Sequence, residues 1–126
     1  MNWQFYLAAA LVVVAFFVYK QFSSRLGAED AAAVAQAVAA GARIVDVRTP
    51  TEFAAGHVPG AVNIPLSELQ GQLKKVGNKR KPVVVYCRSG SRSAHAANIL
   101  RSRGFNQVLD MKAMTNWGRL QTVAAN

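Results

Sequence analysis

One stretch of the chain decides its fold: Val83-Val84-Val85-Tyr86-Cys87-Arg88-Ser89-Gly90-Ser91-Arg92. Its apolar first part predicts a short buried strand, and a helical pattern begins at Ser93. Cys87, the sole cysteine, should therefore lie at the carboxyl end of a strand, in a tight loop that leads into a helix. Unpaired backbone N–H groups and the positive end of the helix dipole converge on such a loop, which favours anions and favours a thiolate over a thiol. The pattern predicts a nucleophilic sulfur that meets an anionic substrate.

Strand and helix patterns alternate around this stretch. Apolar and β-branched runs predict strands at 43–47, 61–64, 83–86 and 107–109, and helical patterns are expected at 29–40, 49–55, 67–75 and 93–103. Alternation of this kind with continuous apolar strands predicts an α/β fold, in which a central parallel sheet is flanked by helices on both faces. Ligands of such sheets bind beyond the carboxyl ends of the strands, which is where Cys87 is expected.

The start of one helix is marked by its own side chains. Thr49 is a suitable N-cap, Pro50 takes the first helical position and Glu52 completes a capping box. Just before this helix, Asp46 and Arg48 stand at the end of a strand. They are best explained as a charge pair that ties this strand to its neighbours.

The N-terminal segment is apolar. Between residues 3 and 19 the only polar residue is Gln4, and as a helix these residues would extend roughly 25 Å, at the short end of what spans a bilayer. Lys20 and Arg25 follow and no basic residue precedes. The positive-inside rule then predicts a single-pass anchor in the inner (cytoplasmic) membrane, with the domain facing the cytoplasm. A cleaved signal peptide is the alternative, but the start lacks positive charge and no small-x-small cleavage site follows.

The chain is divided accordingly. Residues 1–20 form the predicted transmembrane anchor, residues 21–27 a short polar linker, residues 28–120 one compact domain and residues 121–126 a C-terminal tail. A single cysteine excludes an internal disulfide and a thiolate-only metal site. Neither a metal nor a separate cofactor is expected.

The domain carries a surplus of positive charge. The whole chain has a formal net charge of +9, and one basic cluster lies within residues 74–81: Lys74, Lys75, Lys79, Arg80 and Lys81. Aromatic residues do not interleave with this cluster and no nucleic-acid-binding module is recognisable, which argues against nucleic acid as a partner. On a tethered domain, attraction to anionic lipid headgroups is expected, at about 1 kcal/mol per residue.

Three motifs carry a resemblance to a known family. They are Asp46-Val47-Arg48-Thr49-Pro50-Thr51-Glu52-Phe53, Gly56-His57-Val58-Pro59-Gly60-Ala61-Val62-Asn63-Ile64-Pro65 and Val85-Tyr86-Cys87-Arg88-Ser89-Gly90-Ser91-Arg92-Ser93. Over residues 27–117 the chain resembles a single-domain rhodanese, here preceded by a membrane anchor. The resemblance implies a rhodanese-like parallel sheet and a sulfurtransferase, in which a cysteine takes a sulfane sulfur from a donor such as thiosulfate and passes it as a persulfide to cyanide or a thiol.

By the same resemblance, Cys87 is the sulfur carrier, with no cofactor besides its covalent persulfide. The residues that follow would form the cradle for the anion and the persulfide: Arg88, Ser89, Gly90, Ser91, Arg92 and Ser93. The partners are then a small anionic sulfur donor and a thiol acceptor, either a small molecule or a protein. Two arginines can pair with departing sulfite, which favours a doubly charged inorganic donor over a small keto acid such as mercaptopyruvate.

Two other functions compete with this one. Phosphatase relatives of the fold carry Cys-x5-Arg around a phosphate, whereas here Arg92 comes one position too early after Cys87, and Ser93 stands where that arginine would be. The second is a membrane-tethered binding or scaffold module with little catalysis. Rhodaneses commonly have Gly-Gly before Met-x-x-Trp, and this chain has Lys112 and Ala113 there, whose Cβ atoms would reshape the rim of the pocket.

Overall fold

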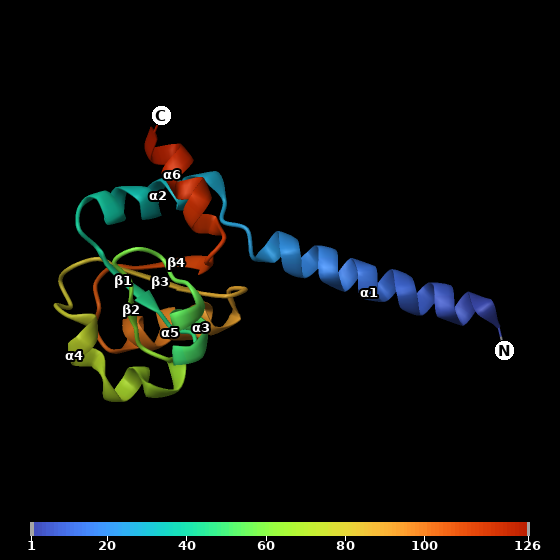
Figure 1. Cartoon of the computed structure of the whole chain (residues 1–126), viewed down its shortest axis with the longest axis horizontal. Coiled ribbons are helices and arrows are strands. Elements are labelled where there is room, and N and C mark those ends of the chain that lie inside the picture. The colour runs from blue at the N-terminus through green and yellow to red at the C-terminus, as the bar shows by residue number, and fades with distance from the viewer. Residues whose placement is uncertain (1, 126) are drawn as a thin grey trace.

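The computed structural model describes residues 2–125, in which a four-stranded parallel sheet lies between two layers of helices and one long helix extends away from it (Figure 1). The helices are α1 (Trp3–Ser23), α2 (Ala28–Ala39), α3 (Pro50–Ala55), α4 (Leu73–Val76), α5 (Ser91–Ser102) and α6 (Asn116–Ala125), with a 3₁₀ helix η1 (Leu66–Gly71). The strands are β1 (Arg43–Asp46), β2 (Val62–Asn63), β3 (Val83–Cys87) and β4 (Val108–Ala113). The expected α/β fold is confirmed.

The sheet has the strand order β2-β1-β3-β4, and every neighbouring pair is parallel. Its central strand β3 is buried along its whole length, which suits a continuous apolar run because both faces of a parallel sheet are covered. Asp46 of β1 lies opposite Asn63 of β2 and Tyr86 of β3. The carboxyl ends of these strands therefore meet at one edge of the sheet.

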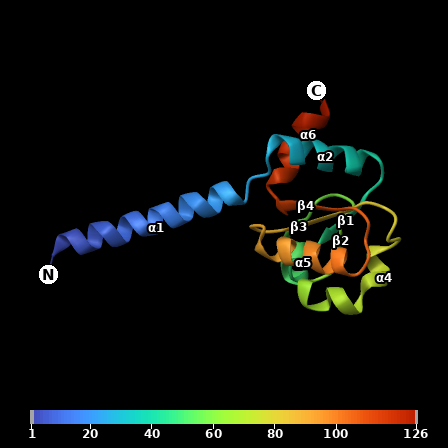
Figure 2. The same cartoon turned by 180° about the vertical axis from the view of Figure 1, so that it is seen from behind.

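Alternating side chains of β3 point into two separate cores. Val83, Val85 and Cys87 belong to the core beneath α5, η1 and α4, whereas Val84 and Tyr86 belong to the core beneath α2 and α6. This alternation follows from the two-residue repeat of a strand. Figure 2 shows the two layers, with α2 and α6 on one side of the sheet and α4 and α5 on the other. Cys87 therefore lies on the face that α5 covers.

Two elements differ from the expected ones in their extent. The helix expected at 67–75 is broken into η1 and α4, because Gln72 between them has a non-helical conformation. Strand β4 continues to Ala113, beyond its expected end, because it pairs with β3 as far as Cys87. The longer strand carries the chain up to the edge of the sheet where Cys87 lies.

The chain after β4 forms a helix that was not expected from the sequence. α6 packs against α2 and buries Leu120. Trp117 and Leu120 lie on one face of α6 because residues three apart are neighbours on a helix surface. The division expected at residue 120 therefore falls within a helix, and the residues taken as a tail continue α6 as far as Ala125.

Helix α1 projects from the domain (Figure 1). Among its residues none is buried, and its large apolar side chains are 50–77% exposed. By length and composition it is able to cross a membrane, and its exposure shows that it is not a core helix of the domain. It continues through Ser23, beyond the anchor boundary expected at residue 20.

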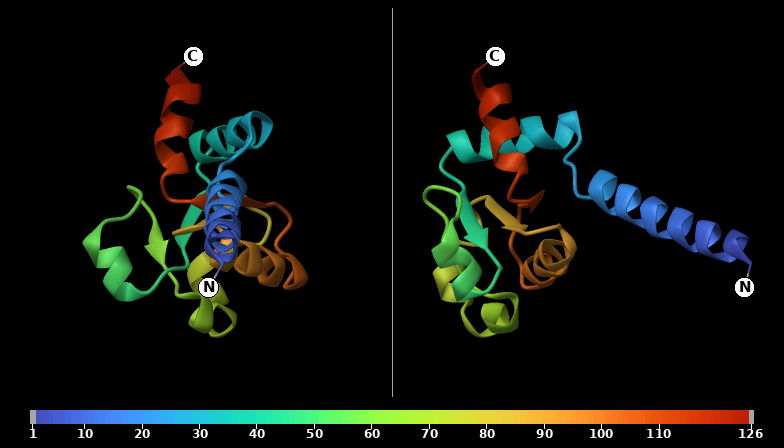
Figure 3. Two further views of the ribbon diagram at one scale, coloured as in Figure 1. Left: turned by 90° about the vertical axis from the view of Figure 1, so that its right-hand side faces the viewer. Right: turned by 45° about the vertical axis from the view of Figure 1, so that its right-hand side comes forward.

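The basic cluster of residues 74–81 lies at the opposite edge of the sheet from α1. It comprises part of α4 and the turn that leads into the amino end of β3, whereas α1 joins the domain on the side of the carboxyl ends (Figure 3). A membrane entered by α1 would lie on the far side of the domain from this cluster. The expected attraction of the cluster to lipid headgroups therefore finds no support in the fold.

Candidate active site

Cys87 is the last residue of β3, and residues 88–90 form the loop between it and α5. Its side chain is buried, with 0% exposed. The loop and the start of α5 direct two backbone N–H groups at its sulfur: Gly90 N lies 3.0 Å and Ser93 N 3.4 Å from Cys87 Sγ. Gly90 has a φ of 106°, a conformation that glycine adopts without strain. These N–H groups favour negative charge on the sulfur.

The side chain of Ser93 holds the loop in place by hydrogen bonds. Its side chain is buried, and its Oγ lies within hydrogen-bonding distance of the carbonyl oxygens of Gly90, at 3.1 Å, and Lys112, at 3.5 Å. The loop is thereby held to α5 and to β4 at once. The structure thus brings Gly90 and Ser93 against Cys87. Three other residues expected in the cradle are exposed around the loop: Arg88, Ser89 and Ser91.

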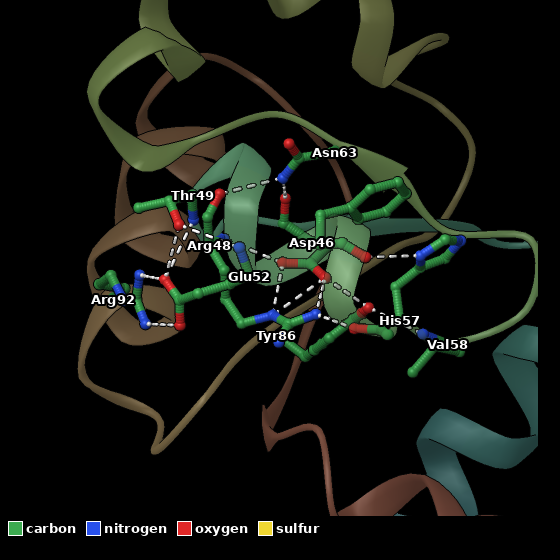
Figure 4. A network of polar contacts seen from close by, with 11 residues as sticks. Asp46, Arg48, Thr49, Glu52, His57, Val58, Asn63, Tyr86 and Arg92 are labelled. Atoms are coloured by element: carbon green, nitrogen blue, oxygen red, sulfur yellow. Dashed lines mark hydrogen bonds and ion pairs between the residues drawn. The ribbon is translucent and has the colours of Figure 1, made fainter.

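Arg92, the remaining residue expected in the cradle, is bound to a carboxylate. Its Nη1 lies 2.7 Å from Glu52 Oε1 and its Nη2 3.0 Å from Glu52 Oε2 (Figure 4). Glu52 Oε1 also accepts hydrogen bonds from the N–H and the hydroxyl of Thr49, so the expected capping box of α3 is confirmed. The sequence marked Glu52 only as a capping residue. No local pattern signals its pairing with an arginine in another helix.

The ion pair shifts the pKa of both partners. The hydrogen bond from Arg92 is the main reason that the pKa of Glu52 falls from its ordinary 4.5 to about 2, and Thr49 adds to this effect. The hydrogen bond to Glu52 raises the pKa of Arg92, and the charge of Cys87 contributes to that rise. Both side chains are therefore charged at neutral pH, and the guanidinium lies within electrostatic reach of the sulfur.

A buried polar network lies on the other face of the sheet from Cys87. Asp46 Oδ2 accepts a 2.7 Å hydrogen bond from Tyr86 Oη and forms a 2.7 Å ion pair with Arg48 Nη2, so the expected charge pair is confirmed (Figure 4). Tyr86 Oη accepts a hydrogen bond from Val58 N at 3.0 Å. Burial is the largest cause that raises the pKa of Tyr86, which keeps it neutral. The network joins the ends of β1 and β3 and supports the active-site edge.

Lys112 of β4 lies against the loop in a strained conformation. Among the non-glycine residues from 2 to 125, it is the one with a positive φ, at 66°. Its N–H donates a 2.8 Å hydrogen bond to Asp110 Oδ1. A Cβ atom on Gly90 would stand 3.3 Å from Lys112 Cβ, so the lysine side chain starts directly beside the loop. Lys112 therefore lies at the rim, where the sequence comparison with the Gly-Gly of rhodaneses predicted that its Cβ atom would reshape the pocket.

The arrangement is suited to covalent chemistry at one sulfur. N–H groups and an arginine provide positive potential around Cys87 Sγ, and the start of α5 adds its dipole. Within residues 2–125, no group of three or more His, Cys, Asp or Glu side chains is placed to hold a metal ion.

Comparison with known families finds one family model that covers both the sheet and the loop after Cys87. Residues 28–118, which include the whole loop after Cys87, match the model of the rhodanese-like domain. The chain belongs to the rhodanese-like domain family. The resemblance inferred from the three sequence motifs is thereby confirmed.

Relatives of this rhodanese-like domain are found in bacteria and in humans. The chain is 44% identical to the uncharacterized protein YqhL of Bacillus subtilis over 78 residues, 61% of each chain. It is 40% identical to the thiosulfate sulfurtransferase PspE of Escherichia coli over 65 residues, 51% of this chain and 62% of PspE. The chain thus spans about three fifths of the length of these relatives. Its structure is similar to the human single-domain sulfurtransferase TSTD1, with a TM-score of 0.61 and 27% identity over 76% of this chain and 96% of that one.

Proposed function

We propose that this protein is a rhodanese-type sulfurtransferase, which moves a sulfane sulfur from thiosulfate or a similar anionic donor through a persulfide on Cys87 to a thiol or to cyanide. The observation that carries the proposal is the pair of N–H groups directed at Cys87 Sγ. They stabilise the attacking thiolate. The covalent persulfide makes a separate cofactor unnecessary.

The reaction has two displacement steps at sulfur. In the first, the Cys87 thiolate attacks the outer sulfur of thiosulfate, the bond between the two sulfurs of thiosulfate breaks, and sulfite leaves with the electron pair. In the second, the acceptor attacks the outer sulfur of the persulfide, and Cys87 leaves as a thiolate. Sulfur passes from donor to acceptor without an outside oxidant or reductant.

Arg88 and Arg92 supply positive charge for the donor and for departing sulfite. Arg88 is exposed at the loop, and the pairing of Arg92 with Glu52 keeps its guanidinium charged. The fork to Glu52 leaves other guanidinium N–H groups free to meet an oxyanion. The exposed hydroxyls of Ser89 and Ser91 complete the cradle.

We also propose that α1 holds the domain at the inner membrane as a single span, with the domain in the cytoplasm. Helix α1 is apolar on all sides and exposed on all sides, and insertion into a lipid bilayer explains both features. Lys20 in its last turn and Arg25 just beyond favour a cytoplasmic location for the domain. A reducing compartment suits a cysteine that cycles between thiolate and persulfide.

A binding or scaffold module with little catalysis is the second candidate. It is favoured by the complete burial of Cys87 and by the Cβ of Lys112 beside Gly90, where a smaller residue would leave a wider approach to the sulfur.

The intact mass of the full-length protein after incubation with thiosulfate separates the two candidates. We expect a gain of one sulfur atom that cyanide or a thiol removes. Cys87→Ser should gain none and should keep the far-UV circular dichroism of the wild type. The double variant Cys87→Ser/Ser102→Cys moves the thiol to an exposed position at the far end of α5 and controls for non-specific uptake. A wild-type protein that gains no sulfur supports the scaffold, and a Cys87→Ser variant that still transfers sulfur contradicts the mechanism.

A further inference from the structure

The segment that joins α1 to the domain is held against α6. Asn116, at the start of α6 and 3% exposed, accepts a hydrogen bond from Leu26 N at 3.4 Å and donates one to the carbonyl oxygen of Ser24 at 2.9 Å. Arg119 Nη1 donates to the carbonyl oxygen of Leu26 at 2.8 Å, and the Leu26 side chain is buried. Of the residues 21–27 expected to form a linker, 21–23 belong to α1 and residues 24–27 form a fixed segment, here called the connector, which sets the direction in which α1 leaves the domain.

That direction brings the end of α1 beside the active-site loop. Lys20 and Ser23, in the last turn of α1, line a cavity of about 270 Å³ together with residues 89–91. In Figure 1 the loop after β3 projects toward the end of α1, and Figure 3 shows α1 emerging from the same side of the domain. Cys87 lies directly behind this loop.

The position of Lys20 also indicates how deep the active-site loop, at the carboxyl edge of the sheet, would lie in a bilayer. With the apolar residues 3–19 in the hydrocarbon layer, Lys20 and the residues that follow lie among the lipid headgroups. The connector comes next and is fixed to α6. The loop at residues 88–90 therefore lies close to the headgroup level.

The surface around this edge is mainly basic. The exposed cations here come from α1, the connector, the active-site loop and α6: Lys20, Arg25, Arg88 and Arg119. Two acidic residues also belong to the edge: Asp110 lines the same cavity as Lys20, and Asp30 lines a neighbouring cavity together with Asp110 and Lys112. Basic groups near a bilayer are attracted to anionic lipid headgroups. The edge is therefore suited to lie against an anionic lipid surface.

We propose that the active-site loop faces the membrane surface and that Cys87 passes its sulfur to a thiol carried by a membrane-held molecule at headgroup level. The inference rests on the proposed sulfurtransferase function and names its acceptor class. The acceptor thiolate attacks the outer sulfur of the Cys87 persulfide, a new S–S bond forms on the acceptor, and the bond to Cys87 Sγ breaks with its electron pair returning to Cys87.

The orientation is tested with the full-length protein in vesicles of phosphatidylcholine and phosphatidylglycerol that contain a nickel-chelating lipid. A nitroxide label is attached at the loop in Cys87→Ser/Ser89→Cys and, as the matched control at the opposite edge, in Cys87→Ser/Lys79→Cys. We expect nickel at the headgroups to relax the label at residue 89 strongly and the label at residue 79 weakly. Equal relaxation at both positions, stronger relaxation at residue 79, or a protein that does not insert would overturn the proposal.

The connector is tested by adding Asn116→Ala to the variant labelled at residue 89. Loss of the hydrogen bonds to the connector should free the domain and weaken the relaxation by headgroup nickel. Arg119→Ala removes one connector contact from an exposed position and serves if the buried substitution impairs folding. Full relaxation in a folded variant of either kind would show that the connector does not set the orientation, which contradicts the argument.

The acceptor is tested with wild-type protein that has been charged from thiosulfate in the same lipid mixture without nickel. The thiol is attached either to the headgroup of a phosphatidylethanolamine or to a soluble headgroup analogue at the same total concentration. We expect the lipid-borne thiol to take up sulfur at least about ten times faster, and equal rates would overturn the proposal. If Cys87 takes no sulfur at all, the sulfurtransferase function itself fails, whereas the label at residue 89 still reports the orientation.

Discussion

Arg92 in α5 and Glu52 in α3 form a two-pronged ion pair, with N–O distances of 2.7 Å and 3.0 Å. Their side chains are 33% and 28% exposed, so the pair remains in contact with water. It ties the start of α5, where the Cys87 loop ends, to the capped start of α3. The same guanidinium that we assign to the anionic donor is thus held in place by a carboxylate.

Replacing Arg92 by alanine should slow sulfur uptake from thiosulfate by about ten- to a hundred-fold. The substitution removes a charge-assisted partner of the departing anion, worth roughly 1.5–3 kcal/mol. The rate is measured as thiocyanate formed with cyanide as acceptor. Arg103→Ala, an exposed position just beyond α5, is the matched control and should keep the wild-type rate. Unchanged turnover in Arg92→Ala would mean that this arginine only holds Glu52.

The same ion pair should make stability depend on pH in the acid range. Because the pKa of Glu52 is about 2 in the folded protein and ordinarily 4.5, the stabilisation is complete above pH 4.5 and is lost as the pH falls toward 2. A partly exposed pair contributes about 1 kcal/mol at most. The free energy of unfolding in urea should therefore differ between wild type and Glu52→Gln near neutral pH, and the difference should shrink across this interval. A difference that stays constant would show that the pair does not stabilise the fold.

Tyr86→Phe should lower the free energy of unfolding by about 1–3 kcal/mol. Without the hydroxyl, buried Asp46 loses a donor and the N–H of Val58 loses its acceptor, and unsatisfied buried polar groups carry this cost. Urea unfolding followed by circular dichroism provides the measurement. Tyr19→Phe, on the exposed surface of α1, removes the same hydroxyl and should leave the domain unchanged. A Tyr86→Phe variant with the same free energy of unfolding as the wild type would contradict a structural role for the network.

Lys112→Gly should raise the free energy of unfolding by about 1 kcal/mol, because glycine relieves the left-handed backbone at φ 66°. Lys112→Ala is the matched control. Alanine also removes the long side chain but keeps the Cβ atom, so it should give no comparable gain. Equal stabilisation by glycine and alanine would assign the effect to the lysine side chain and not to its backbone.

The full-length protein should fractionate with the membrane and resist extraction by high salt, since the burial of apolar side chains in lipid does not depend on charge. Protease added outside intact cells or spheroplasts should spare the domain if the proposed orientation holds, with Lys20 and Arg25 on the cytoplasmic side. Digestion of the domain from outside would show that the domain lies on the other side of the membrane and would contradict the proposed orientation. A mature chain that begins beyond residue 20 would identify the N-terminal segment as a cleaved signal.

Local sequence patterns determined the elements that build the site. The apolar run that ends in Cys87, the capping box at Thr49 and Glu52, and the alternation of strands and helices depend on residues close together in the chain. Strand periodicity and helix capping act over a few residues. The parallel sheet, and the place of Cys87 at the carboxyl end of its central strand, were therefore predictable.

Helix α6 was not predictable in the same way. Its apolar face is buried by packing against α2 and β4, where Leu120 joins the core. Most helical stability in proteins comes from such packing, and propensity alone contributes little. Local patterns therefore did not reveal that residues 121–125, expected as part of a tail, continue α6.

Tertiary structure alone decided how the site is oriented. Arg92 binds Glu52, which lies 40 positions away in the sequence, and Leu26 donates a hydrogen bond to Asn116, which lies 90 positions away. A hydrophobic or polar pattern predicts that a residue is buried or charged, but the partner depends on how distant elements pack. For this reason the sequence predicted an apolar N-terminal helix and a loop around Cys87, whereas the packing of α6 against the connector decided that the two lie on the same side of the domain.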